Sequence, residues 1–271
     1  MGLSTPRRWA ILTVAVLVAS TPVPAQADAD PVGALKRHLR ADHGVRISEA
    51  TRIVLGKRAT ETRISGRLRL APSGPAAADL TWWTLPKRET YRMIRVGSTV
   101  YDGSNVHPGP IPDGKKWIRF PNKHRGLTAR DMAADASQQP INVYDPTTLK
   151  AVLKRSARKP GFLYQGTMSY RDLDKITEAP LVHWTSGRPF GPKSKGKITW
   201  KLWTGRDGML KRLLTTDTEG TLVKRTDTRY SAWGSRVAIT APPAEDVIDE
   251  ADLLEYIRNE NEPIPEDEGN T

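Results

Sequence analysis

The sequence contains no cysteine. Disulfide scaffolds, thiolate metal sites, cysteine nucleophiles and a lipid-modified N-terminal cysteine are therefore excluded. Beyond the first segment the sequence also lacks any stretch that is long and apolar enough to span a bilayer. With 38% hydrophobic and 27% charged residues, and 21 each of Gly and Pro in 271 residues, the composition is typical of a polar globular protein with many turns.

The N-terminal segment has the features of a secretory signal peptide. Arg7 and Arg8 form its positive region, Trp9 to Ser20 is apolar, and Ala25-Gln26-Ala27 is a cleavage site of the small-x-small type. An N-terminal membrane anchor is the alternative, but a spanning helix needs about 20 apolar residues. We expect residues 1–27 to be removed and the mature protein to be secreted into the cell envelope or beyond, without a lipid anchor.

Charge is divided unevenly along the mature chain. Between Asp28 and Ala244 there are 39 Lys and Arg residues against 19 Asp and Glu, whereas from Glu245 onward there are eleven acids and one base. A basic body attracts anionic lipid head groups, wall polymers or nucleic acid, and also its own acidic tail. An anionic membrane surface or a wall polymer is therefore a candidate partner, and an evenly solvated surface is the alternative. Nucleic acid is not expected, because no RNA-binding or DNA-binding signature is present.

Most of the mature sequence alternates in the manner of β-strands. Leu68 and Leu70 lie between Arg67 and Arg69, so that one face of the strand is apolar and the other is basic. Gly97-Ser98 predicts a tight hairpin. The predicted strands are 50–55, 61–71, 79–85, 91–96, 99–102, 117–120, 161–170, 197–203, 209–216, 222–230 and 236–240.

Helices are predicted at fewer places. Asp145-Pro146 places a capping carboxylate and a first-turn proline before a helix that runs to about Ala157. A short helix is predicted over 34–43, where it would turn its two histidines away from one another and stop at Gly44. A weaker helix is predicted over 128–136, and a segment rich in Pro, Gly and Ser over 178–195 is predicted to be an exposed loop.

Strands in succession with helices grouped between them predict an α+β fold, in which one antiparallel sheet carries helices on one side. Rossmann and α/β-barrel orders do not fit. We expect a single domain over 28–258. Residues 245–259 have apolar side chains at helical spacing and are predicted to form an amphipathic helix that docks on the body. The polar acidic tail over 259–271 is predicted to be disordered.

A set of motifs carries a resemblance to a known family. The motifs are Gly66-Arg67-Leu68-Arg69-Leu70, Arg95-Val96-Gly97-Ser98-Thr99-Val100-Tyr101, Gly114-Lys115-Lys116-Trp117, the Asp145-Pro146 helix, Gly166-Thr167-Met168-Ser169-Tyr170, Trp200-Lys201-Leu202-Trp203 with Asp207-Gly208, and Arg229-Tyr230-Ser231-Ala232-Trp233-Gly234 before Val237-Ala238-Ile239. In this order, over 46–249, the sequence resembles the LolA-like superfamily of envelope lipoprotein and lipid carriers. It is most similar to the LppX/LprG-type secreted lipid carriers of actinobacteria.

The resemblance implies a curved antiparallel sheet, an incomplete barrel, with helices covering its concave face and an apolar cavity between the two layers. Relatives use such a cavity for the acyl chains of lipids or lipoproteins. Close relatives of the LppX type carry a lipidated cysteine at the signal cleavage site, which this sequence lacks, and the acidic tail is not part of the family pattern.

Apolar side chains that alternate on several predicted strands are candidates for lining the cavity. The candidate ligand-binding residues are Leu68, Leu70, Leu80, Trp82, Met93, Trp200 and Leu202. The alternative is that they form the ordinary core between sheet and helices. Because Trp82 and Trp83 are adjacent on a predicted strand, one ring faces away from the core, where it stacks on a sugar or packs against a helix.

Patterns that indicate catalysis or cofactor binding are lacking in the sequence. None of the five histidines lies in a metal-ligand spacing, and there is no Gly-x-Ser-x-Gly elbow, phosphate loop or dinucleotide fingerprint. We therefore expect no catalytic residue, no cofactor and no metal. The leading prediction is a secreted, non-enzymatic carrier or binding protein for a lipid or other amphiphile. An envelope-stress sensor or protein-interaction module of the same fold, and a hydrolase of a wall polymer, stay open.

Overall fold

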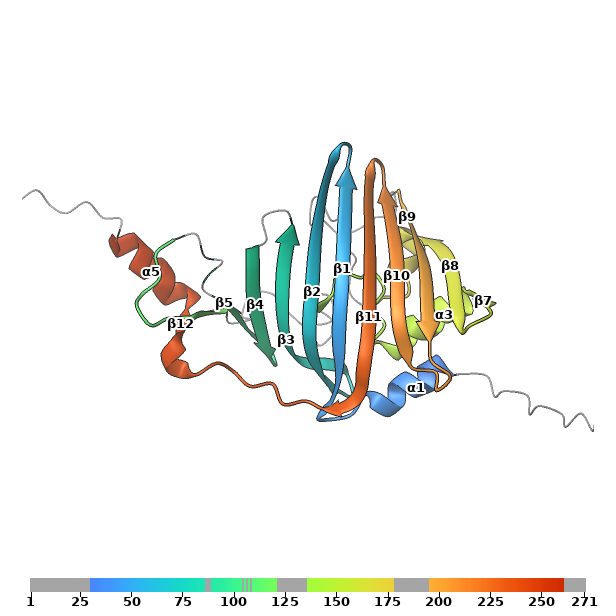
Figure 1. Cartoon of the computed structure of the whole chain (residues 1–271), viewed down its shortest axis with the longest axis horizontal. Helices are drawn as coiled ribbons and strands as arrows, with labels where there is room; N and C mark the ends of the chain where they lie inside the picture. The colour runs from blue at the N-terminus through green and yellow to red at the C-terminus, as the bar shows by residue number, and fades with distance from the viewer. Residues whose placement is uncertain are drawn as a thin grey trace, which may run out of the picture.

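The main element of the protein is an open sheet of twelve strands, in the order β12-β6-β5-β4-β3-β2-β1-β11-β10-β9-β8-β7 (Figure 1). A computed structural model describes residues 30–85, 89–103, 105, 107, 109–120, 136–177 and 195–260. Neighbouring strands are antiparallel except β12 and β6, which run parallel. The large, mostly antiparallel sheet with few helices confirms the predicted α+β class.

The strands are β1 (His43–Leu55), β2 (Arg58–Ala71), β3 (Gly74–Leu85), β4 (Glu89–Val96), β5 (Thr99–Gly103), β6 (Trp117–Phe120), β7 (Ala157–Lys159), β8 (Leu163–Ser169), β9 (Lys197–Thr204), β10 (Leu210–Glu219), β11 (Leu222–Arg236) and β12 (Val247–Asp249). The helices are α1 (Pro31–His38), α3 (Pro146–Lys154), α4 (Tyr170–Asp174), α5 (Glu250–Glu260) and the 3-10 turn η3 (Ala244–Asp246). The predicted hairpin at Gly97-Ser98 joins β4 to β5, and Gly97 has the positive φ of 59° that this turn requires.

Several predicted segments fall outside the described residues. They are the signal peptide over 1–27, the weaker helix over 128–136 apart from its last residue, the loop over 178–195 apart from its last residue, and the tail over 259–271 apart from its first two residues.

The centre of the sheet is formed by β1 between β2 and β11. Ser48 pairs with Ser65 of β2 on one side and with Arg229 of β11 on the other. The third strand of this group, β11, comes near the end of the described chain. The middle of the sheet therefore joins the N-terminal strands to the C-terminal ones.

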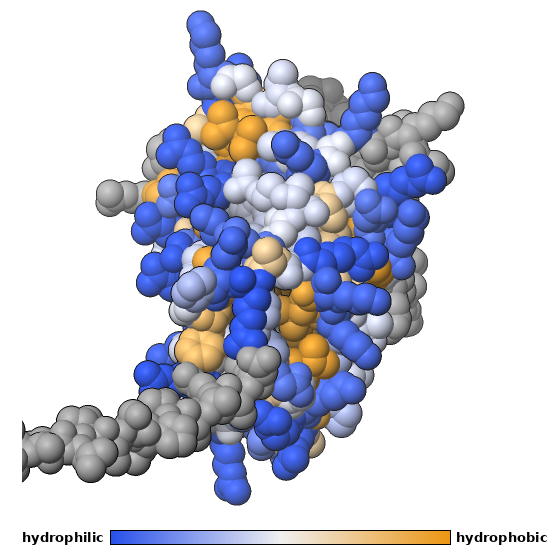
Figure 2. Space-filling model, turned by 90° about the vertical axis from the view of Figure 1, so that its right-hand side faces the viewer, coloured by the Kyte–Doolittle hydropathy of each residue, from blue (hydrophilic) through white to orange (hydrophobic). Residues whose placement is uncertain are grey.

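The two faces of the sheet differ in burial. We call the face that carries Val45 and Ile47 of β1 the interior face, and the opposite one the outer face. Interior side chains form one core cluster with Leu35 of α1, Leu149 of α3 and Leu173 of α4, so these helices pack on the interior face. Figure 1 shows α1 and α3 beside the half of the sheet that ends in β7, and Figure 2, which looks from that side, shows mostly hydrophilic surface with small hydrophobic areas between.

Helix α3 begins where the sequence predicts. The Asp145 carboxylate accepts hydrogen bonds from the backbone N–H groups of Thr147 at 2.9 Å and Thr148 at 3.0 Å. The helix ends at Lys154 and not at about Ala157, because residues 157–159 pair with β8 as the edge strand β7.

Two predicted elements differ from the structure. The helix predicted over 34–43 is α1 over Pro31–His38, and β1 already begins at His43, so that Gly44 lies in a strand and does not stop the helix. The segment predicted as a strand over 236–240 pairs with no described strand after Arg236. Its alternation has another cause, since Val237 and Ile239 pack against Ala77 and Ile94 on the outer face.

The C-terminal region is helical over a shorter range than predicted. Val247 and Ile248 lie in β12, which pairs with β6, and the helix α5 starts only at Glu250. The apolar contact of α5 is made by Leu253, which packs with Ile118 and Ile248 in a small separate cluster. The predicted docking is present, but Leu254 of the predicted stripe is 55% exposed.

Candidate functional site

All seven sequence-predicted ligand-binding residues lie on the interior face. Leu68, Leu70, Leu80, Met93, Trp200 and Leu202 are at most 8% exposed and belong to the main core cluster, and Trp82 is partly buried against it. Their register explains the shared face, because Leu80 pairs with Met93 across β3 and β4 and Trp82 pairs with Tyr91. The structure thus gathers these residues into the main apolar core of the interior face.

Trp200 is held by shape as well as by a hydrogen bond. Its Nε1–H donates to Ser156 Oγ at 2.9 Å, just beyond the end of α3. Gly166 of β8 lies opposite, and a Cβ there would come within 2.2 Å of the indole ring. The ring therefore fills the space that the glycine leaves and ties the sheet to the α3 end.

Trp82 differs from Trp200 in having an unpaired donor. Its ring stacks on that of Tyr91 with centroids 5.7 Å apart, and both side chains are only partly buried. The Trp82 Nε1 atom itself is buried and has no hydrogen-bond partner among the described residues. Such an orphan donor in an apolar surface is costly unless water or a ligand supplies an acceptor.

A second, polar part of the interior face surrounds Glu49 of β1. This carboxylate is 3% exposed and accepts hydrogen bonds from the Ser137 hydroxyl, from the Gln138 backbone N–H at 2.7 Å and from the Thr228 hydroxyl at 2.6 Å. Gln139 extends the network, since its side-chain N–H group donates to Thr228 Oγ1 at 2.8 Å. These bonds fasten the segment around 137–139 across β1 and β11.

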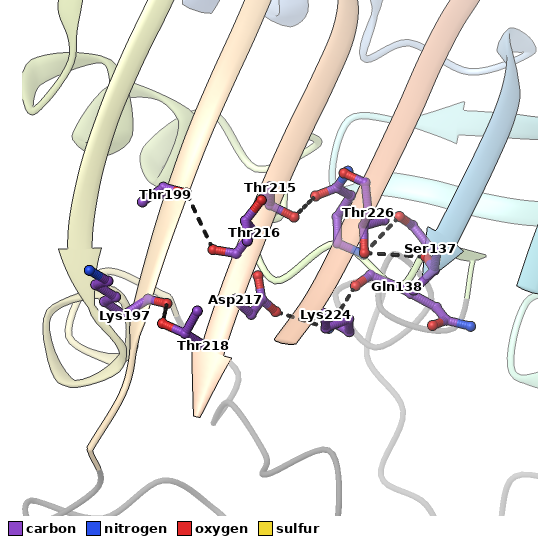
Figure 3. A network of polar contacts seen from close by, with 12 residues as sticks. Ser137, Gln138, Lys197, Thr199, Thr215, Thr216, Asp217, Thr218, Lys224 and Thr226 are labelled. Atoms are coloured by element: carbon purple, nitrogen blue, oxygen red, sulfur yellow. Dashed lines mark hydrogen bonds and ion pairs between the residues drawn. The ribbon is translucent and has the colours of Figure 1, made fainter. Parts of the chain in front are cut away.

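The same network continues to a buried ion pair. Lys224 of β11 lies 3.1 Å from Asp217 of β10 and also donates to the Gln138 carbonyl at 3.1 Å (Figure 3). Both charged residues are at most 8% exposed. Thr51 Oγ1 and Thr226 Oγ1 bond to one another between this pair and Glu49, at 3.2 Å. The interior face is therefore apolar toward one end of the central strands and polar toward their hairpin end.

Burial changes the protonation of these groups. Desolvation raises the pKa of the Glu49 carboxyl above its usual range despite the hydrogen bonds that it accepts. Desolvation likewise raises the pKa of Asp217 despite its contact with Lys224. The pKa of the neighbouring Tyr144 phenol is raised well above its usual value, mainly by burial, and its hydroxyl has no partner among the described residues. Tyr144 is therefore a neutral group with a free O–H.

The sequence did not single out this polar network. Glu49 and the threonines occupy the same alternating positions as core residues, so the period-2 pattern assigns them to the interior without saying what they contact. The available signal was a glutamate at an inward position between Ile47 and Thr51. Its partners come from segments 88 and 179 positions away in the sequence, which no local pattern reveals.

The prediction for the two histidines is wrong. Because α1 ends at His38 and β1 begins at His43, the chain turns between them and brings the two rings to a centroid distance of 5.9 Å. Burial, and then the proximity of His43, lower the pKa of His38. No group of three or more His, Asp or Glu side chains suited to a metal ion occurs in the part of the chain that the structure describes.

The comparisons with known proteins give distant structural similarity alone. No family model and no curated protein matches the sequence. Among solved structures, a chain of the MucA/MucB complex of Pseudomonas aeruginosa aligns with a TM-score of 0.31 and 15% identity, over 80% of this chain and 62% of that one. A separate structure of MucB gives a TM-score of 0.31 and 16% identity, over 82% of this chain and 65% of that one.

A LolA superfamily protein from Nitrosomonas europaea aligns with a TM-score of 0.30 and 9% identity, over 79% of this chain and 93% of that one. The protein is thus distantly similar in structure to a LolA superfamily member and to MucB, and it spans less than two thirds of either of the first two chains. Scores near 0.3 carry no conclusion about function, and the closer resemblance to LppX/LprG-type carriers finds no support here. None of the described helices is both long and apolar enough to cross a membrane.

Proposed function

We propose that the protein is a non-enzymatic, extracytoplasmic binding protein for an amphiphile, which it holds against the interior face of its sheet. The observation that carries this proposal is the division of that face into an apolar part and a polar part. An apolar chain against Leu80 and Met93 would place a polar head group toward the hydroxyl and carboxyl groups around Glu49. A ligand of mixed polarity matches this pattern better than a wholly apolar or a wholly polar one.

The unpaired donors support the same proposal. Trp82 Nε1 and the Tyr144 hydroxyl are buried without a partner among the described residues. A buried donor that is left unpaired costs about 1–3 kcal/mol, and an acceptor on a bound molecule removes that cost. Trp82 and Tyr91 are stacked and only partly buried on this face, so they are the first place at which a bound molecule is expected to make contact.

The test is displacement of a fluorescent amphiphile from the full secreted protein. We expect an acyl-chain probe to bind at micromolar concentration and long-chain lipids to displace it, while analogues with chains of a few carbons do not. Native mass spectrometry followed by lipid extraction then identifies what the protein carries after purification. Absence of probe binding, or binding that does not depend on chain length, overturns the proposal.

Trp82→Phe is the informative variant. It keeps an aromatic ring on Tyr91 but removes the unpaired Nε1 donor, so we expect weaker binding of a lipid with an acceptor in its head group, while the free protein loses no described hydrogen bond. Trp203→Phe, on the outer face of β9, is the matched control. Equal loss of affinity in both variants would mean that the probe is not bound at the interior face.

A further inference from the structure

The outer face of the central strands carries more positive charge than its own acids neutralise. Exposed or partly exposed arginines project from β1, β2, β4, β10 and β11, and the acids among them are Glu61, Asp79 and Asp227. The arginines are Arg46, Arg52, Arg63, Arg67, Arg69, Arg92, Arg212, Arg225 and Arg229.

The acids of this face are already occupied. Asp79 binds both Arg67 at 2.9 Å and Arg92 at 2.8 Å, and Asp227 is held by Arg212 at 2.6 Å. The arginines at 46, 52, 69, 225 and 229 have no ion pair among the described residues. The outer face therefore has a net positive charge that would attract an anionic ligand.

A furrow crosses this face from β11 through β1 and β2 to β3 and β4. It has a volume of about 1000 Å³ and is open to solvent. Small side chains form its floor, since Ser48 pairs with Ser65 and Ala50 follows two positions along β1. Longer side chains border it, among them Arg229 and Trp83. Strands lie about 4.8 Å apart, so a ligand that spans from β11 to β3 is extended and longer than a single small molecule.

The chemistry of the furrow is mixed. Trp83 is directly opposite Arg63 in the pairing of β2 with β3, and its indole is partly exposed. Serine hydroxyls both donate and accept hydrogen bonds, and guanidinium groups bind carboxylates or phosphates with two parallel N–H donors. A flat aromatic ring offers an apolar surface to the C–H face of a sugar ring. Hydroxyls, an aromatic ring and arginines in one extended furrow suit a chain of acidic sugars.

A lipid membrane fits this face less well. Stable binding in a membrane interface combines electrostatic attraction to anionic lipids with apolar side chains that enter the lipid. The exposed large hydrophobic residues of the described chain are Leu55, Val223 and Leu254, and none of them borders the furrow. Trp83 lines the furrow and is only partly exposed.

We propose that this furrow binds an anionic polysaccharide, with sugar rings against Trp83, hydroxyl groups on Ser48 and Ser65, and acidic groups on Arg63 and Arg229. The site lies on the opposite face of the sheet from the proposed amphiphile site and does not depend on it. One protein would then hold an amphiphile on one side while it rests on an acidic wall polymer with the other.

The test compares four ligands by titration calorimetry with the full secreted protein at low salt. Oligogalacturonate is the acidic sugar probe, a maltooligosaccharide of equal length is the neutral sugar, inorganic polyphosphate carries charge without sugar rings, and a single-stranded oligonucleotide carries charge with bases. We expect oligogalacturonate to bind, the neutral sugar to bind at least about tenfold more weakly, and added salt to weaken the acidic sugar.

Matched variants separate stacking from general attraction. We expect Trp83→Ala and Arg229→Gln each to weaken oligogalacturonate binding by about tenfold, which is the usual scale for a hydrogen bond to a charged group or a stacked ring. The controls are Trp203→Ala, on the outer face of β9, and Arg225→Gln, on the same face of β11 but outside the furrow. Both controls should stay within about twofold of the parent protein.

Any of four results overturns the proposal. Equal weakening by the furrow variants and their controls, or polyphosphate binding as tight as that of the sugar, means that the face attracts anions without recognising a glycan. Tighter binding of the oligonucleotide assigns the furrow to nucleic acid. Competition by phosphatidylglycerol vesicles but not by phosphatidylcholine vesicles assigns it to a membrane. If circular dichroism shows that Trp83→Ala does not fold, the binding results for Trp83→Leu and Arg229→Gln decide the question. The amphiphile displacement assay is run on each variant as well, so that a failure at the furrow is distinguished from a failure at the interior face.

Discussion

Alternate residues of the central strands form the interior face and the outer face, and the two faces differ in whether their charged side chains are paired. On the interior face Lys224 is paired with Asp217, and Glu49 accepts hydrogen bonds from three donors. On the outer face Arg225 and Arg229 of the same strand have no ion pair among the described residues. Interior charge is therefore structural and expensive to disturb, whereas outer charge is available to a ligand.

The largest difference between the faces is expected for tryptophan. Trp200→Ala removes a ring that is 2% exposed, which lowers the free energy of unfolding by about 4 kcal/mol. Trp203→Ala, on the other face of β9, removes a ring that packs under Arg212 at 4.9 Å and should cost about 1 kcal/mol or less. Urea denaturation of both variants measures the difference. Similar losses in the two would mean that burial does not separate the faces.

The next largest effect concerns the buried ion pair. Lys224→Met leaves Asp217 buried without its cation, and we expect a loss of about 3 kcal/mol in the free energy of unfolding. Arg225→Met, one position further along β11 and exposed, is expected to change stability by less than about 0.5 kcal/mol. The double variant of Lys224→Met with Asp217→Leu should recover much of the loss, and failure to recover would show that the cost comes from packing and not from an unpaired charge.

Measuring the free energy of unfolding as a function of pH compares a buried carboxylate of the interior face with an exposed one of the outer face. Burial raises the folded-state pKa of Glu49, so the folded protein binds a proton more tightly than the unfolded chain, whose glutamate pKa is about 4.3. Its contribution to stability is thus fully present below that value and is lost as pH rises through the folded pKa. Glu49→Gln should flatten the fall in stability that begins above the unfolded pKa, by about 1.4 kcal/mol for each unit by which the pKa is raised.

The control for this titration is Glu61→Gln on the outer face, whose carboxylate forms an ion pair with the exposed Arg63. Denaturant curves at several pH values are expected to overlay those of the parent protein for this variant. Parallel pH dependence of the Glu49→Gln variant and the parent would contradict the assignment of Glu49 as the buried proton-binding group.

The smallest effect is expected for the outer-face ion pairs. Burial works against ionisation of Asp79, but hydrogen bonds from Arg92 and Arg67 outweigh it and lower its pKa. Its stabilising contribution is therefore present above the unfolded pKa and lost as pH falls through the lowered one. We expect Asp79→Asn to cost about 1 kcal/mol at pH 7 and low salt, because solvent screens these exposed arginines. The cost should shrink in 1 M salt, and a salt-independent cost would indicate a packing effect.

Regular alternation made the strands predictable, and the unpredicted features come from contacts distant in sequence. Leu68 and Trp200 follow a local pattern that identifies both the strand and its buried face. In contrast, Val237 and Ile239 alternate in the same way but pack on the sheet without joining it. A period-2 pattern reports burial on one side and not hydrogen-bond pairing, so the two cases look alike in the sequence.

The candidate sites show the same limit. The apolar residues of the interior face were predictable as a group, and so was the placement of one tryptophan on each side at Trp82 and Trp83. Which ring faces outward depends on strand register, which the sequence leaves open. The furrow depends on the juxtaposition of Ser48, Ser65 and Arg229 from three strands, and only the pairing of β1 with β2 and β11 creates it.

The pairing of β1 with β11 also governs how the chain reaches its native state. Thr51 and Thr226, which meet at this pairing, are 175 positions apart in the sequence. The strands β1 to β5 and the strands β9 to β11 follow one another through short connections, so each of these two groups assembles locally, whereas residues 170–196 separate β8 from β9. Joining the two groups of strands must close a very long loop. Because folding slows as contacting residues become more distant in the sequence, we expect this step to be slow. Until β11 has emerged and docked, β1 and β10 are both open edges, and the half-folded protein is most prone to pair with another copy of itself at that stage.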